Sequence, residues 1–209
     1  FTENTALGIT QASNVSFIIC TAPLLTTILS LLFYKSEKAS KGLIYGSLLA
    51  LMGVGLIVFN GSFVLKISPI GDWLTLLAAL SWAFYSLIIK KMAGRYPTVF
   101  ITRKIFFYGV LTILPAFLLH PLQPDAAVLL QPGVLFNLLF LAVLASLICY
   151  VLWNVVLKQL GTVRASNYIY LNPLVTMIAS SLILDEKITL VALGGAACIV
   201  CGVYWAEKK

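Results

Sequence analysis

The sequence predicts an all-α integral membrane protein with about seven transmembrane helices, and three observations carry this prediction. Of the 209 residues, 61% are hydrophobic and only 10% are charged, against roughly 25% charged in an ordinary soluble domain. The charged residues stand between long uncharged stretches. Most of these stretches approach or exceed the roughly 20 residues that a helix needs to cross a bilayer, whereas a transmembrane β-strand is about half as long.

The uncharged stretches define the expected helices, and together they leave no room for a separate soluble domain. The fourth helix must begin near Thr98, directly after Pro97, because a start at Ile105 would leave only 15 residues before Leu119. Proline is tolerated at the start of a helix, where its missing N–H is not needed. We expect helices at 11–34, 42–60, 70–92, 98–119, 133–158, 163–184 and 189–206.

The placement of charge between these segments predicts the orientation. Twelve of the 14 Lys and Arg residues fall on one side, and only Lys66 and Lys187 fall on the other. Cytoplasmic loops are enriched in Lys and Arg. We therefore expect the chain to enter from outside and to end in the cytoplasm, in a bacterial cytoplasmic (inner) membrane. The basic excess is a topology signal, and we expect no nucleic-acid partner.

An internal repeat links the two ends of the chain. The tripeptide Ala12-Ser13-Asn14 recurs as Ala165-Ser166-Asn167. The further matches are Pro23 with Pro173, Thr26 with Thr176, Glu37-Lys38 with Glu186-Lys187, Gly46 with Gly195, and Gly53 with Gly202. By the expected orientation the two copies cross the membrane in opposite directions. An inverted repeat of this kind is typical of secondary transporters, whose two halves expose one site alternately to each side.

These motifs resemble those of the EamA-type carriers of the drug/metabolite transporter (DMT) superfamily. The resemblance implies a ten-helix bundle of two inverted five-helix repeats. Residues 1–60 would hold the end of helix 3 with helices 4 and 5 of the first repeat, 61–69 an external linker, and 70–209 the complete second repeat, helices 6–10. Because the chain starts at Phe1 without an initiator Met, we expect that it is truncated at its N-terminus.

Two prolines mark the expected substrate site. Pro23 and Pro173 lie midway along their helices, so each removes a backbone hydrogen bond and frees the carbonyls of Ile19 and Ile169. Paired interruptions of corresponding membrane segments point to a binding site, although a mere helix kink is the alternative. The polar neighbours of the two prolines that we expect at the site are Thr26, Asn167, Tyr170 and Asn172. Adhesion between helices is the competing interpretation of these side chains.

Other polar and aromatic residues share helix faces. Polar atoms are costly in hydrocarbon, so such faces should turn inward and line a substrate cavity, with interfacial aromatic belts as the alternative. The expected residues are Trp82, Tyr85 and Ser86 on the third helix and Ser146, Tyr150, Trp153 and Asn154 on the fifth. Arg103 lies inside the start of the fourth helix, where it would attract an anionic substrate or extend to the lipid headgroups.

The sequence thus favours a secondary transporter, not an enzyme, that moves small organic metabolites (amino-acid-like or amphipathic solutes) by alternating access, in the direction of export. The expected partners are the lipid bilayer and the solute, with no metal and no cofactor, because all four cysteines lie in apolar segments without nearby His or acidic ligands. A seven-helix receptor-like protein and an intramembrane enzyme are the alternatives. The single histidine, His120, stands at an external helix end and offers no catalytic constellation.

Overall fold

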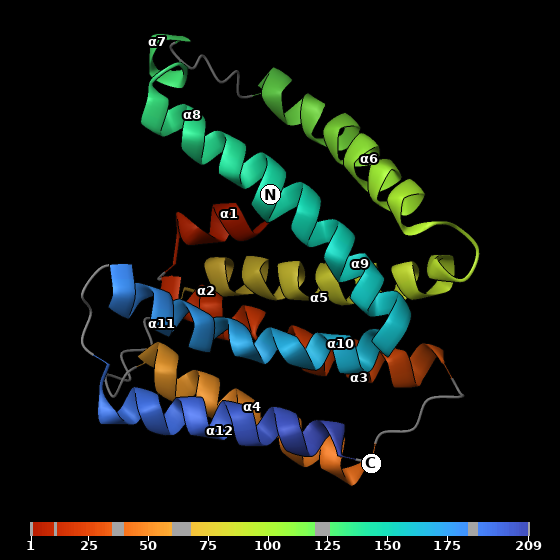
Figure 1. Ribbon diagram of the computed structural model, residues 1–209, viewed down its shortest axis with the longest axis vertical. Helices are drawn as coiled ribbons and strands as arrows, with labels where there is room; N and C mark the ends of the chain where they lie inside the picture. Colours follow the sequence, from red (N-terminus) through yellow and green to blue (C-terminus); the bar gives the residue numbers. More distant parts are fainter. Residues whose placement is uncertain are drawn as a thin grey trace. The chain divides into compact units, whose positions relative to one another are not determined.

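The computed structural model describes residues 2–10, 12–34, 40–59, 68–119, 126–183 and 188–208. Over these residues the chain is helical and contains no strand (Figure 1). The fold class predicted from the sequence is therefore confirmed. Several charged motifs used in the sequence analysis lie outside the described residues, among them Glu37-Lys38, Glu186-Lys187, His120 and most of the linker 61–69.

Each expected helix has a counterpart within about two residues of its predicted ends. The elements are α1 (Thr2–Leu7), α2 (Ala12–Ile19), α3 (Ala22–Phe33), α4 (Lys41–Phe59), α5 (Pro69–Ala93), α6 (Thr98–Leu119), α7 (Ala126–Leu129), α8 (Pro132–Leu139), the π-helix η1 (Phe140–Ile148), α9 (Cys149–Leu160), α10 (Thr162–Asn167), the 3-10 helix η2 (Tyr168–Leu171), α11 (Asn172–Ile183) and α12 (Leu190–Glu207). Helix α6 begins at Thr98 after Pro97, as its length required.

Among the described residues, six helical segments are long and apolar enough to cross a membrane. They are 14–33, 41–59, 69–93, 98–115, 132–160 and 190–207. The seventh expected span corresponds to α10, η2 and α11, which follow one another from Thr162 to Ile183. This segment is not one uninterrupted helix, because a 3-10 turn replaces regular α-helix at its centre.

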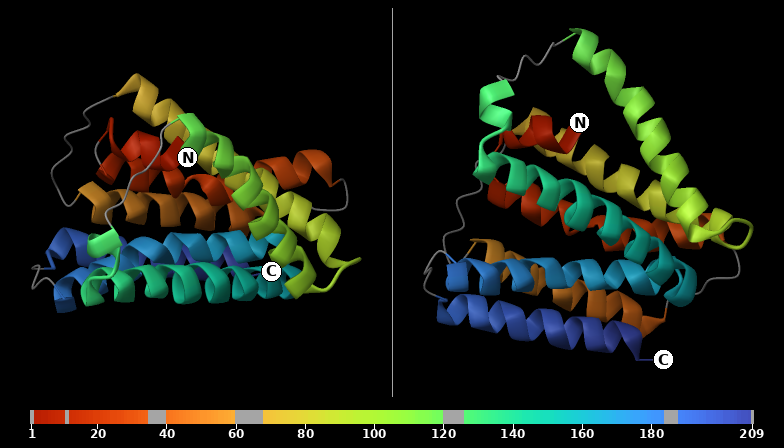
Figure 2. Two further views of the ribbon diagram at one scale, coloured as in Figure 1. Left: turned by 90° about the horizontal axis from the view of Figure 1, so that it is seen from above. Right: turned by 45° about the horizontal axis from the view of Figure 1, so that its top comes forward.

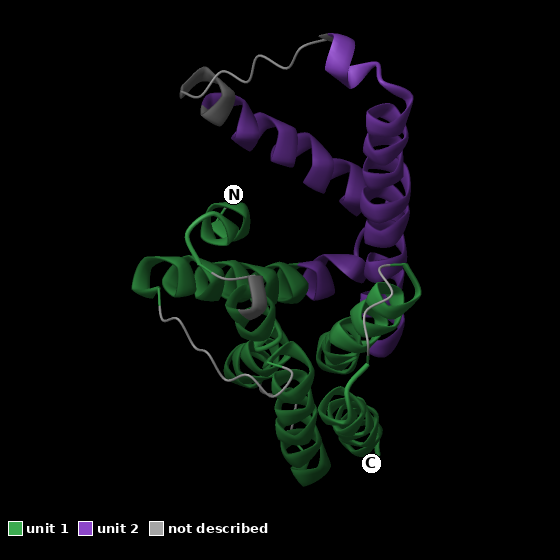
Figure 3. Cartoon of the chain, turned by 90° about the vertical axis from the view of Figure 1, so that its left-hand side faces the viewer, with its two compact units in different colours: residues 1–88, 161–209 green, residues 89–160 purple. Residues whose placement is uncertain are grey.

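The chain divides into two compact units (Figure 3). Unit 1 comprises residues 1–88 and 161–209, and unit 2 comprises residues 89–160. Unit 1 contains α1 to α4, most of α5, and α10 to α12. In unit 2, α6 packs against α9.

Helices α4 and α12 form the most extensive helix contact of unit 1 and lie side by side in Figure 1 and in the right-hand view of Figure 2. Their backbones touch at glycines: a Cβ built on Gly53 would lie 2.5 Å from the carbonyl oxygen of Gly195, and one built on Gly202 would lie 2.6 Å from that of Gly46. Only residues without side chains permit such an approach. The glycines matched by the repeat therefore form a packing surface.

The glycine contacts are reciprocal. Gly46 faces Gly202, while Gly53 faces Gly195, so the two helices run antiparallel. In the sequence repeat Gly46 corresponds to Gly195 and Gly53 to Gly202. If the two copies of the repeat are exchanged, the contact between Gly46 and Gly202 therefore becomes the contact between Gly195 and Gly53. This is the pattern expected of two equivalent helices related by a two-fold axis.

Candidate functional site

The first membrane segment is interrupted just before Pro23. Helix α2 ends at Ile19, Cys20 and Thr21 form a turn, and α3 starts at Ala22 with Pro23 in its first turn. Proline has no N–H, so the carbonyl of Ile19 cannot receive the bond that residue 23 would normally donate. The hydroxyl of Thr21 donates instead to the carbonyl oxygen of Ile18 at 2.6 Å. The predicted interruption is thus a two-residue turn within the helical segment 14–33.

The corresponding segment near the C-terminus is interrupted before Pro173. Here the 3-10 helix η2 ends at Leu171, and α11 begins at Asn172, so that Pro173 again occupies the first turn of the following helix. The two breaks occur at repeat-equivalent positions, because Pro23 and Pro173 are matched residues. Paired irregular backbone of this kind is tolerated in a membrane only where it faces protein or a water-filled cavity.

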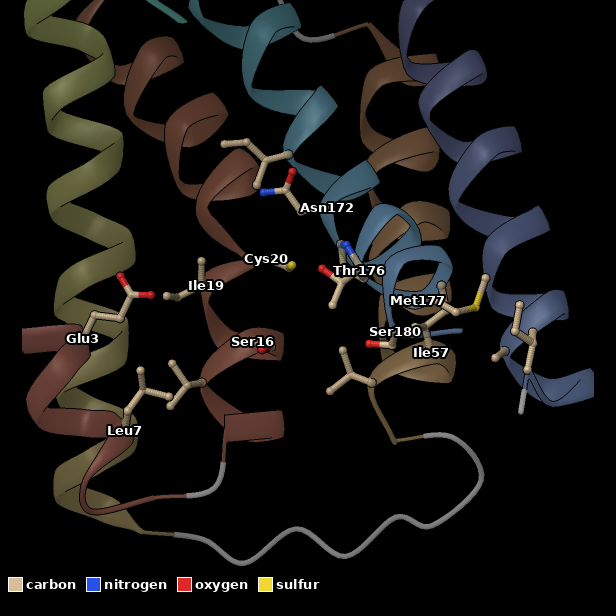
Figure 4. A pocket seen from close by; sticks show the side chains of 16 residues that line it. Glu3, Leu7, Ser16, Ile19, Cys20, Ile57, Asn172, Thr176, Met177 and Ser180 are labelled. Carbon is tan, nitrogen blue, oxygen red and sulfur yellow. The ribbon is translucent and has the colours of Figure 1, made fainter. Parts of the chain in front are cut away.

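A cavity of about 530 Å³ lies beside both breaks in unit 1 (Figure 4). This volume falls in the range of sites that hold small organic ligands. In Figure 4, Cys20 faces Thr176 across the space, while Ile19 points toward Glu3. The residues that line the cavity are Glu3, Leu7, Val15, Ser16, Ile19, Cys20, Ile57, Val58, Ile169, Asn172, Pro173, Thr176, Met177, Ser180, Ile188 and Ala192.

The cavity wall is mainly apolar with a few neutral polar groups. Ser16, Asn172, Thr176 and Ser180 supply hydroxyl and amide groups. Ile19 and Ile169, whose carbonyls the prolines were predicted to free, both belong to the wall. An apolar enclosure with a small number of hydrogen-bonding groups suits an amphipathic solute, since the apolar area gives affinity and the polar groups fix orientation.

A polar cluster is buried beside the cavity. Ser47 of α4 donates to the side-chain oxygen of Asn167 at 3.4 Å, and both residues are at most 2% exposed. Tyr170 of η2 is completely buried and joins the apolar cluster that includes Cys20 and Val54. The amide nitrogen of Asn167 finds no partner among the described residues. Asn167 and Tyr170 thus hold η2 against α4 and do not line the cavity.

The opposite end of unit 1 is closed by packing. Helix α10 lies against α3, with Ser30 and Ala165 fully buried. The hydroxyl of Tyr34 donates to the carbonyl oxygen of Leu87 at 3.2 Å, and that of Thr162 to the carbonyl oxygen of Ser86 at 3.5 Å. In the described part of unit 1, the cavity thus lies at one end and close helix packing at the other.

Repeat-equivalent residues occupy opposite environments in this arrangement. Thr176 and Ser180 of α11 line the cavity. Their counterparts at the same spacing in α3, Thr26 and Ser30, are completely buried, and Thr26 donates its hydroxyl to the carbonyl oxygen of Ala22 at 2.8 Å. The same sequence element is therefore packed in one copy and accessible in the other.

Of the predicted site residues in unit 1, Asn172 and Pro173 line the cavity. Pro23 and Thr26 are buried within α3. The aromatic set on α5 is partly buried: the rings of Trp82 and Tyr85 lie 5.3 Å apart, and Ser86 is buried with its hydroxyl bonded to the carbonyl oxygen of Trp82. The cavity does not include these three α5 residues, and their role as substrate contacts stays a prediction.

The remaining predicted residues belong to unit 2. Tyr150 packs edge-on against Phe106 at 5.6 Å, and Trp153 is half-buried on the same helix. Ser146 lies on the π-helix η1, so its angular position relative to the α9 residues differs from the regular spacing assumed above. Arg103 is exposed, with its guanidinium 5.5 Å from the centre of the Phe100 ring.

Asn154 fastens α9 to α6. Its side-chain amide donates to the hydroxyl of Thr102 at 2.9 Å, and both residues are at most 2% exposed. We expect Asn154→Ala to lower the free energy of unfolding by about 0.5–2 kcal/mol, because buried polar contacts between membrane helices have this size. Unfolding by SDS measures the effect. Asn137→Ala, at an exposed position of α8, is the control, and an equal effect of both changes would contradict the assignment.

Sequence reasoning missed most of the cavity wall. Thr176 was matched with Thr26 in the repeat, yet only Thr26 was taken as a site residue. Ser180 matches Ser30 at the same spacing, a signal that the sequence did contain. Glu3 was not among the predicted site residues. No sequence pattern marked Cys20 or Met177, which are apolar residues on helices full of apolar residues.

The broken helices, the cavity and the apolar spans together define a helical membrane transporter. The family profile described as "EamA-like transporter family" matches residues 69–206. The chain is 30% identical over 206 residues, 98% of its length and 70% of the other's, to a protein of Archaeoglobus fulgidus named "Uncharacterized transporter". The chain belongs to the EamA-like transporter family, of the DMT type.

Two further similarities complete the comparison. Over 182 residues, 82% of this chain and 60% of the relative, it is 29% identical to a "Probable amino-acid metabolite efflux pump" of Salmonella typhimurium. A solved crystal structure superposes with a TM-score of 0.85 at 17% identity, over 99% of this chain and 71% of that one. The chain therefore spans about 60 to 70% of these proteins, and the structural likeness shows the fold alone.

Proposed function

We propose that the protein is a secondary transporter, not an enzyme, that moves small organic metabolites, amino-acid-like or amphipathic solutes, by alternating access. The observation that carries this proposal is the opposite environment of repeat-equivalent residues. Thr176 and Ser180 line the cavity while Thr26 and Ser30 are packed. In the alternate state the two copies would exchange roles, so Thr26 and Ser30 would then line a cavity that opens at the other end.

The proposed domain organisation follows from the same repeat. Residues 1–60 are the C-terminal part of the first repeat, 61–69 the external linker, and 70–209 the second repeat. The span of the family match, 69–206, supports the start of the second repeat, and the reciprocal glycine contacts of α4 and α12 support the pairing of the two copies.

The proposed orientation places the cavity on the outer side of the bacterial cytoplasmic membrane, with the C-terminus in the cytoplasm. The cavity is lined by Ile57 and Val58 near the end of α4, by Ser180 near the end of α11, and by Ala192 near the start of α12. The positive-inside rule puts these helix ends outside. Unit 1 is thus in an outward-facing state, closed toward the cytoplasm by the α3–α10 contact.

The proposed direction is export. The name of the Salmonella relative supports it, since that protein is called a probable amino-acid metabolite efflux pump. Flux is measurable in vesicles that contain the protein, loaded with a panel of radiolabelled amino acids and amphipathic metabolites. Efflux of at least one solute above that of protein-free vesicles is the expected result. Absence of flux for every solute, with correctly folded protein in the membrane, would contradict the proposed function.

Trp82 and Tyr150 are the aromatic residues whose replacement should affect this flux most. We expect Trp82→Ala or Tyr150→Ala to reduce flux by about tenfold, since a lost aromatic contact is worth up to ~1.5 kcal/mol. Expression and folding should be retained. The matched controls are Trp73→Ala, on the helix of Trp82, and Tyr108→Ala, on the helix of Phe106. They are suitable because Trp73 is 66% and Tyr108 57% exposed. Equal flux of a site variant and the wild type would remove that residue from the substrate path.

A further inference from the structure

Among the described residues that line the cavity of unit 1, Glu3 is the one carboxylate. None of these described lining residues is a Lys, Arg or His. In Figure 4 the carboxylate of Glu3 extends from α1 toward Ile19 at the side of the cavity. A carboxylate at the edge of an apolar enclosure makes the local potential negative, which raises the local concentration of cations and lowers that of anions.

No described residue neutralises this carboxylate. Glu3 forms no ion pair or hydrogen bond with the residues that the structure describes. Leu7, Val15 and Ile19, which line the cavity together with Glu3, are apolar. A carboxylate left without a partner beside an apolar surface is available to a bound cation, because an ammonium group can supply the charge-assisted hydrogen bond that the protein does not.

The rest of the wall sets the shape of such a ligand. Ile57, Val58 and Met177 offer apolar surface, while Thr176 and Ser180 offer hydroxyls without charge. A ligand that fits this wall has an apolar body, one cationic group and no anion, because a ligand carboxylate would meet no cationic side chain among the described lining residues. The volume of about 530 Å³ is sufficient for a small aromatic amine.

We propose that this cavity binds small apolar amines, with the ammonium group on Glu3 and the apolar body against α4, α11 and the start of α12. The inference rests on the proposed function, because it names the solute class of that same cavity. Of the two solute classes named in the proposed function, this inference favours the amphipathic solutes over the zwitterionic amino acids.

The test is protection of a cavity thiol. In a variant whose native cysteines are replaced by alanine, Thr176→Cys places a thiol on the wall, and its modification by N-ethylmaleimide is timed in the presence of four matched probes. The probes are phenethylamine, 3-phenylpropanamide, 3-phenylpropionate and phenylalanine, which share a phenyl group and differ in charge. We expect phenethylamine to protect the thiol at a concentration about fivefold lower than the amide does, because this ratio corresponds to the free energy of one partly exposed charge pair. We expect the other two probes to protect the thiol less than phenethylamine does.

Two variants locate the charge. Glu3→Gln should abolish the preference for the amine over the amide, while Glu207→Gln, at the far end of α12 and outside the cavity, should leave it intact. Equal protection by amine, amide and carboxylate, or a preference that survives Glu3→Gln, would overturn the proposal. Protection by phenylalanine as strong as that by phenethylamine would overturn it as well.

The outcome is separable from that of the transport assay. Protection measures binding and requires no flux. Charge-independent protection with intact flux would refute the amine site and leave the transporter standing. Glu3-dependent protection by the amine without any flux would confirm the binding site and refute transport.

Discussion

Gly202→Ala should lower the free energy of unfolding by about 1–3 kcal/mol, the usual cost of overpacking a well-packed interface. The added Cβ would lie 2.5 Å from the backbone nitrogen of Ala50 and 2.6 Å from the carbonyl oxygen of Gly46. Both neighbours are backbone atoms of α4 and cannot rotate away. The two helices would have to separate, which would weaken contacts along their whole length, and Gly202→Leu should abolish folding. Unfolding by SDS, followed by circular dichroism, measures the effect.

Gly194→Ala is the matched control. Gly194 lies on the same helix, but a Cβ there would meet no heavy atom within 4 Å. Since alanine favours the helix over glycine by about 0.5–1 kcal/mol, this substitution should be neutral or stabilising. Gly195→Ala, one residue further, should again be destabilising, because its Cβ would lie 2.7 Å from the carbonyl oxygen of Gly53. If Gly202→Ala, Gly194→Ala and Gly195→Ala all changed the free energy of unfolding by a similar amount, backbone contact between α4 and α12 would be contradicted.

The spans and their interruptions could be predicted from the sequence because they depend on local chemistry. Uncharged length sets a membrane helix, and α6 begins at Thr98 as its length required. A proline at position 23 or 173 removes one hydrogen bond of the helix backbone, which favours a kink or an interruption at that point.

The open side of the cavity could not be predicted, because an inverted repeat gives both sides nearly the same residues. Thr26 and Thr176 follow their prolines at the same distance, yet only Thr176 lines the cavity. Which copy is packed is a property of the conformational state, and two states of similar free energy share one sequence. Glu3 was missed for a different reason, since only the fold places the short helix α1 beside α2.

Cysteines placed at repeat-equivalent positions should react from opposite sides of the membrane. In outward-facing protein without native cysteines, Thr176→Cys and Ser180→Cys should react with an impermeant thiol reagent added outside. Thr26→Cys and Ser30→Cys should resist it, because both positions are fully buried. The rate of thiol modification at these buried positions should be lower by about tenfold for every ~1.4 kcal/mol of free energy needed to expose the thiol.

The four variants form two repeat-equivalent pairs, Thr26 with Thr176 and Ser30 with Ser180. Each comparison is made within a pair, so differences in thiol reactivity between the two kinds of position cancel. Alternating access further requires that Thr26→Cys and Ser30→Cys react from the cytoplasmic side when the protein turns over, and that Thr176→Cys is then protected. Reaction of Thr176→Cys from the cytoplasmic side alone would reverse the proposed orientation. Reaction of both pairs from the same side would mean a static cavity, because a carrier with two equivalent halves cannot expose both copies at once.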